Sequence, residues 1–194
     1  MQSRGEPFPD SSMLAVLAVY PVTQSTLNII RTLLVHNTQS EVSRAPNQAI
    51  VAMCYEGHLN LVQLMLDIGA NVNQSCKAWW KRPGNLVRTP FMMAIGNSRK
   101  DLISLLLSRG ADANQKQNVQ GSICGNALSE AARLGSDGLQ DMKLLLAHGA
   151  DVNANAGHYG SPLTAALGFH QINAVRLLIL NGADVNMVME SHYP

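Results

Sequence analysis

The stretch Leu-Leu-Leu-Ala-His-Gly-Ala-Asp-Val-Asn at residues 144–153 is one of four near copies of a single phrase in this sequence. The other three copies occupy residues 64–73, 105–114 and 177–186. The glycines at the matching place in each copy, spaced 41, 39 and 33 residues apart, are Gly69, Gly110, Gly149 and Gly182. Self-similarity at this period indicates a repeat array, in which each unit buries its apolar face against its neighbours.

Each phrase is preceded by the start of another helix. Thr89-Pro90 and Ser161-Pro162 both place a proline twenty residues before the glycine of their repeat. A threonine or serine hydroxyl suits the N-cap of a helix, and proline suits its first position. Apolar residues spaced three and four apart then form the stripe of a second helix, which the glycine ends. The sequence therefore predicts an all-α fold built of helix–turn–helix pairs.

The repeat unit resembles the ankyrin repeat. The last unit matches the family pattern of Thr-Pro-Leu-His, an alanine pair, Val-x-x-Leu-Leu and Gly-Ala-Asp-Val-Asn almost throughout. The resemblance covers residues 48–186 and extends back to Ser12, where a worn first helix pair is expected. The histidine of the family pattern is replaced in the four units by Val51, Met92, Ser129 and Thr164. The resemblance implies an ankyrin-repeat solenoid with loop or hairpin fingers and a function in binding other proteins.

The repeat boundaries divide the chain into six segments. A flexible N-terminus is expected at 1–11, and a degenerate first repeat with a linker at 12–47. Four clear repeats follow, the first with a long basic finger that carries tryptophan and the last with a short tail, at 48–88, 89–125, 126–160 and 161–194. The loops at 121–128 and 157–163 look like those of ankyrin arrays in large filamentous-fungal proteins, where the array is often the recognition end of a multidomain sensor.

The composition argues against several classes of function. Fourteen basic and thirteen acidic residues give a net charge of +1, so no overall field steers the chain toward nucleic acid or an anionic membrane. The apolar run at residues 13–20 lacks the flanks of a signal peptide, and no stretch approaches the ~20 apolar residues of a membrane span. The three cysteines, an odd number with no close pair, argue against a disulfide framework. We expect a cytoplasmic protein, with the nucleus as the alternative location.

No arrangement of residues typical of catalysis stands apart from the repeat. The six histidines fall in turns and at helix ends without the spacing of metal ligands, and no phosphate-binding or dinucleotide-binding glycine motif is present. Cys54 is expected in the core as a small apolar residue. Cys76 and Cys124 are expected in loops, where a thiol can be exposed. We therefore predict a protein that is not an enzyme and that binds neither a metal nor a cofactor.

The resemblance places binding on the concave groove beside the first helices and on the loop tips next to it. Residues just before each helix–helix turn would face this groove. The candidate partner contacts among them are Tyr55, Glu56, Asn97, Arg133 and Phe169. The alternative is that these positions form an ordinary solvated edge, since single exposed apolar residues are normal on protein surfaces.

The sharpest local feature is the insertion at residues 74–88, QSCKAWWKRPGNLVR, which carries both tryptophans and no acidic residue. Tryptophan and arginine dominate the hot spots of protein interfaces. The candidate partner contacts in this finger are Trp79, Trp80, Lys81, Arg82 and Arg88. Alternatively, one tryptophan folds back onto the neighbouring loop, or the finger binds nucleic acid or a phospholipid headgroup through stacking and cations.

We therefore predict a protein-binding scaffold or adaptor whose partner is another protein, and nucleic acid is not the expected partner. Two alternatives stay open: a fragment of a larger multidomain sensor or regulator, and binding of nucleic acid or headgroups by the finger. The last repeat also has Leu180 where the family usually shows a polar residue. This predicts an apolar C-terminal face that meets a further repeat, a partner or a second copy of the chain.

If the finger contacts the partner, replacing Trp79 and Trp80 together by alanine should weaken partner binding about tenfold or more. The melting transition should stay nearly unchanged, because exposed side chains add little to the free energy of unfolding. Partner capture and thermal unfolding, measured on the same double variant, check the two parts. A large loss of thermal stability would instead place the tryptophans in the core.

Overall fold

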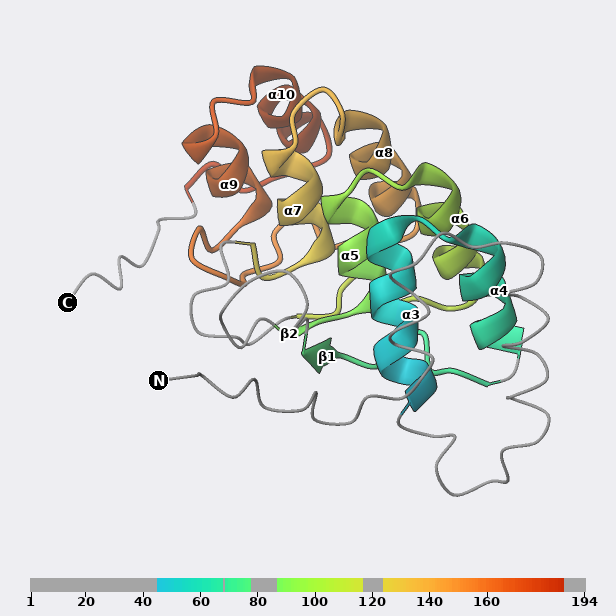
Figure 1. The fold of residues 1–194 in the computed structure, drawn as a ribbon. Coiled ribbons are helices and arrows are strands. Elements are labelled where there is room, and N and C mark those ends of the chain that lie inside the picture. Colours follow the sequence, from blue (N-terminus) through green and yellow to red (C-terminus); the bar gives the residue numbers. More distant parts are fainter. Residues whose placement is uncertain (1–44, 68, 78–86, 117–123, 187–194) are drawn as a thin grey trace, which may run out of the picture.

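The computed structural model describes residues 45–67, 69–77, 87–116 and 124–186 (Figure 1). The helices of this part of the chain come in pairs, each a first helix, a tight turn and a second helix. The four pairs are α3 (Ala45–Glu56) with α4 (Leu59–Asp67), α5 (Pro90–Gly96) with α6 (Lys100–Ser108), α7 (Ala127–Arg133) with α8 (Leu139–Ala147), and α9 (Pro162–Gly168) with α10 (Ile172–Leu180). None of these helices is long and apolar enough to cross a membrane.

The pairs stack side by side into two layers (Figure 1). The first helices pack in chain order, α3 against α5, α5 against α7 and α7 against α9. The second helices form the other layer, with α4 against α6 and α8 against α10. The predicted all-α solenoid of helix–turn–helix pairs is therefore confirmed.

The expected caps begin the first helices. The Thr89 hydroxyl accepts a hydrogen bond from the Met92 amide at 3.1 Å, and proline occupies the first turn of α5. Ser161 does the same for Thr164 at 3.2 Å, and its own amide donates to the Thr164 hydroxyl. In the third pair the Asn126 side chain takes this place and accepts from the Ser129 amide at 2.8 Å. Each cap satisfies an amide that the helix itself leaves unpaired.

The repeated phrase also joins each pair to the next through its last asparagine. The side-chain amide donates to the glycine carbonyl of the following phrase, with distances of 3.1, 2.9 and 3.3 Å for Asn73 to Gly110, Asn114 to Gly149 and Asn153 to Gly182. The same side chain accepts from the next aspartate amide, at 2.8, 2.7 and 2.8 Å for Asp112, Asp151 and Asp184. We call this series of paired hydrogen bonds the asparagine ladder. It fixes the register of neighbouring repeats.

The base of the predicted finger is a short antiparallel hairpin. Strand β1 (Cys76–Lys77) pairs with β2 (Val87–Arg88), so that Cys76 lies opposite Arg88. Residues 78–86, which include both tryptophans, Lys81 and Arg82, lie outside the described residues. The hairpin form of the finger agrees with the sequence, while the contacts of its tip stay a prediction.

Two glycines with positive φ allow the cost of backbone strain to be distinguished from the cost of a steric overlap. Gly149 (φ +79°) ends α8 in open space, whereas a methyl group on Gly157 (φ +76°) would overlap the backbone of Gly125 in the neighbouring loop. Gly149→Ala should lower the free energy of unfolding by roughly 1–2 kcal/mol, the cost of a left-handed alanine. Gly157→Ala should cost at least about 1 kcal/mol more, because two backbones must move apart. Urea unfolding of both variants checks this, and equal losses would contradict the close loop contact.

Candidate protein-binding surface

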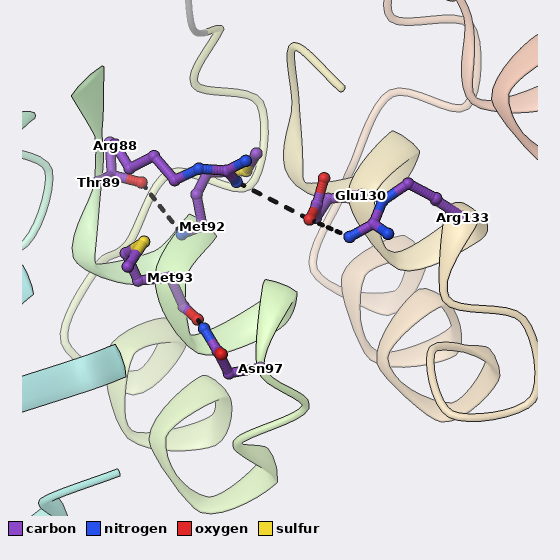
Figure 2. A network of polar contacts seen from close by, with 7 residues as sticks. All are labelled: Arg88, Thr89, Met92, Met93, Asn97, Glu130 and Arg133. Atoms are coloured by element: carbon purple, nitrogen blue, oxygen red, sulfur yellow. Dashed lines mark hydrogen bonds and ion pairs between the residues drawn. The ribbon is translucent and has the colours of Figure 1, made fainter. Parts of the chain in front are cut away.

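The five predicted groove residues share one place in the fold. Tyr55, Glu56, Asn97, Arg133 and Phe169 all lie at or just beyond the C-terminal ends of the first helices, and all are half-buried. Not every one of these side chains is equally available to a partner. The Asn97 amide donates to the Met93 carbonyl at 2.8 Å, and so helps to end α5 (Figure 2). Such a position lets a side chain stabilise the array and still present one edge to the solvent.

A buried carboxylate, that of Glu130, lies between Arg88 and Arg133 (Figure 2). The Glu130 side chain is only 4% exposed, and it lies 2.6 Å from an Arg133 nitrogen and 3.8 Å from an Arg88 nitrogen. Burial lowers the pKa of the Arg133 guanidinium, but the hydrogen bond and the charge of Glu130 outweigh this effect and raise the pKa above its usual value. Glu130 therefore ties the base of the finger at Arg88 to the end of α7.

The Arg133 side chain also lies close to an aromatic ring, that of Phe169, which in turn packs against Tyr159. Its guanidinium carbon lies 5.7 Å from the centre of the Phe169 ring, within the range of a cation–π contact. The Tyr159 ring lies 5.2 Å from Phe169 and tilts against it. Gly168 leaves room for this arrangement, since a methyl group there would collide with the Tyr159 ring. We call Arg133, Tyr159 and Phe169 the aromatic–arginine cluster. All three side chains are half-buried.

Sequence reasoning named Arg133 and Phe169 but missed Glu130 and Tyr159. A signal for Glu130 exists, because it is the fourth residue after the N-cap Asn126. The corresponding residues Met93 and Ala165 are apolar and buried. An acid at such a position indicates a buried charge with basic partners. Tyr159 lies in a loop, and no periodicity marks it.

The cysteines differ in part from expectation. Cys54 is buried in the core as predicted. Cys124, expected in a loop with a thiol that can be exposed, is fully buried. Burial, followed by the charge of Glu130 and a hydrogen bond to it, raises the pKa of the Cys124 thiol to about 12. This residue belongs to the polar surroundings of the buried Glu130 side chain. In the described ranges no three His, Cys, Asp or Glu residues are grouped so that they could hold a metal ion.

A second buried acid lies in the layer of second helices. Asp141 on α8 is 2% exposed, and one of its carboxylate oxygens has no hydrogen-bond partner among the described residues. The corresponding residues Leu61 and Leu102 are buried and apolar. Burial raises the pKa of Asp141, and the nearby Lys100 only partly opposes this. Asp141 therefore belongs to the packing of the repeats rather than to the groove.

The stacked pairs define an all-α repeat solenoid, and the comparison with known proteins gives its family. The family described as "Ankyrin repeats (3 copies)" matches residues 15–117, more than half of the 194 residues. The chain therefore belongs to the ankyrin-repeat family. Ankyrin repeats are generally protein–protein interaction modules, and their fold is typically non-enzymatic.

Individual relatives are similar over part of their length. The chain is 31% identical to the leucine-rich repeat serine/threonine-protein kinase 1 of Caenorhabditis elegans over 157 residues, which is 74% of this chain and 6% of that protein. It is 32% identical to the ankyrin repeat, SAM and basic leucine zipper domain-containing protein 1 of Neofelis nebulosa over 113 residues, 57% of this chain and 21% of that protein. The corresponding protein of Microcebus murinus is 32% identical over 124 residues, 61% of this chain and 23% of that protein. The chain thus spans less than a quarter of each of these three relatives, and the resemblance to filamentous-fungal arrays stays a prediction.

Asp141 should make the stability depend on pH. Its pKa is higher in the folded than in the unfolded protein, so the free energy of unfolding falls as the pH rises through the window above the usual pKa of 3.8. Asp141→Asn, which removes the charge at nearly constant shape, should therefore be more stable than the wild type at pH 7, by up to about 1 kcal/mol. Below this window the advantage should vanish. Chemical unfolding at several pH values checks this, with Asp137→Asn as the exposed control, and an equal gain for both variants would contradict it.

Proposed function

We propose that this chain is a protein-binding scaffold that holds its partner against the groove end of its first helices and against the neighbouring finger. The observation that carries the proposal is the aromatic–arginine cluster, Arg133, Tyr159 and Phe169, which stays partly open to solvent. Tyrosine and arginine are among the residue types that dominate binding hot spots. The ankyrin-repeat family generally supplies interaction modules, which agrees with this use of the surface.

The cluster is suited to binding because it is already held in place. Arg133 donates to the buried Glu130 at 2.6 Å and lies against the Phe169 ring, so its side chain has little freedom left to lose. Ordering a long side chain at an interface costs about 0.5–1.5 kcal/mol, and a side chain that is fixed beforehand avoids much of this cost. The aromatic rings add apolar area with few rotatable bonds.

The finger joins the same surface through Arg88. This residue ends β2, and its guanidinium lies 3.8 Å from the carboxylate that also binds Arg133. A partner that touches the cluster would therefore lie close to the base of the finger. We include Trp79, Trp80, Lys81 and Arg82 in the proposed surface on the strength of their residue types. Tyr55, Glu56 and Asn97 would extend it along the groove.

Two other functions compete with this proposal. The chain spans only 6% of the nematode kinase and 21% of the relative from Neofelis nebulosa, which fits a part of a larger sensor or regulator. In that case the groove would bind its partner on behalf of a longer protein. Nucleic acid or a phospholipid headgroup is less well supported, because Arg88 and Arg133 both already face Glu130. A strong dependence of binding on salt would favour this last alternative.

Phe169→Ala tests the proposal. The immobilised wild-type chain should capture a defined set of proteins from native lysate, and the variant should lose those that depend on the cluster, with affinity reduced about tenfold or more. Leu59→Ala is the matched control, because Leu59 is an exposed apolar residue at the start of α4. It should capture the same proteins as the wild type.

Two further measurements separate the possible outcomes. Thermal unfolding of Phe169→Ala shows whether the array remains intact, as expected for a half-buried side chain at its edge. Capture that disappears between low and moderate salt, together with nucleic acid in the bound fraction, would replace the protein partner by a nucleic acid. Identical capture by the wild type and Phe169→Ala would contradict the proposal.

A further inference from the structure

In α9, the first helix of the final pair, a position is exposed that the earlier repeats bury completely. Ile95 and Ala132 are each the sixth residue after their N-cap, and both are 0% exposed, as is Cys54 at the corresponding place in α3. Leu167 is the sixth residue after Ser161 and is 54% exposed. The earlier helices are followed by another first helix that packs against them, and within the described residues α9 is not.

The second helix of the same pair shows the same contrast. Ile179 on α10 is 48% exposed, whereas the corresponding Leu107 on α6 is 9% exposed. Most of the large exposed apolar side chains of the described residues belong to this final pair and the turn after it. They are Leu167, Ile172, Ile179, Leu180 and Val185. Leu59 is the remaining one.

The asparagine ladder stops at the same place. The backbone amide of Asn186 donates to the Asp184 carboxylate at 2.9 Å, just as that of Asn114 donates to Asp112 at 2.8 Å. The turn is therefore preformed. The side chain of Asn114 bridges to the next repeat, but the side chain of Asn186 makes no hydrogen bond to any described residue. It offers a donating NH2 group and an accepting carbonyl oxygen at the edge of an apolar face.

We propose that the face formed by α9, α10 and Asn186 binds a further ankyrin-type helix pair, carried by a partner protein. We call it the end face. Leu167, Ile179 and Val185 would cover a first helix rich in small residues, as α7 and α9 are. The Asn186 amide would donate to a glycine carbonyl and accept from an aspartate amide of the partner, which repeats the pairing inside the array. This surface is independent of the groove in the proposed function.

Both parts of the end face point to this kind of partner. Apolar side chains alone would fit any apolar surface. The asparagine adds a polar requirement that a lipid surface cannot meet, since it needs a carbonyl and an amide side by side. A Gly-Ala-Asp turn supplies this pair in each of the three internal junctions of the described array. The expected partner therefore carries the same Gly-Ala-Asp turn that the asparagine ladder binds inside this chain.

The test uses the full chain and a designed probe, a consensus protein of two ankyrin repeats with an uncovered N-terminal face and a polar C-terminal cap. Titration calorimetry should show saturable binding with one probe per chain. Leu167→Glu and Ile179→Glu should each weaken binding about tenfold or more, because a charge would be buried against the probe. Asn186→Ala should weaken it by about threefold to tenfold, the loss of neutral hydrogen bonds. Leu59→Glu, outside the end face, should leave binding unchanged.

Three results would overturn the proposal. One is that the probe does not bind the wild-type chain, and another is that it binds Leu167→Glu and Ile179→Glu as tightly as the wild type. The third comes from sedimentation of the wild-type chain alone. A dimer that Leu167→Glu converts to a monomer would assign the end face to a second copy. Circular dichroism of each variant confirms that it is folded, which is expected because the substituted side chains are about half exposed.

Discussion

A short helix pair cannot bury its own apolar face, and the rest of this structure depends on that constraint. Ile95 and Ala132 reach zero exposure because a further first helix packs beside each of them. The burial that stabilises one repeat is therefore supplied by the next. Small residues on α7 and α9 let the helices approach closely, and the asparagine ladder holds the approach in one register. Stability is a property of neighbouring pairs rather than of any single one.

Glu130 shows how a buried charge can fix the side chains of the candidate surface. The carboxylate occupies a position that is apolar in the other described repeats, so it needs basic partners to offset the loss of water. Arg133 and Arg88 supply them from the end of α7 and from the finger base. Because the same contacts fix Arg133 against Phe169, the charge that the fold must neutralise also preorganises the candidate surface.

The repeated phrase and its spacing were sufficient to predict the helix pairs and the caps at Thr89 and Ser161, because these depend on residues close together in sequence. The surroundings of Glu130 could not be predicted in this way. Its partner Arg88 belongs to another repeat, and Cys124 is buried although it lies outside the helices. The repeat period encodes neither the contact between Arg88 and Glu130 nor the burial of Cys124.

The two separate surfaces lie near each other at the end of α9. Leu167 lies in its last turn and belongs to the end face, while Phe169 follows Gly168 and belongs to the aromatic–arginine cluster. Phe169 lies just beyond the last residue of α9, so its ring and the Leu167 side chain belong to different faces. A helix pair docked on Leu167 would place its own first helix beside α9, just as α9 packs beside α7. The groove would then continue past Phe169 and offer a partner a longer surface than this chain presents alone.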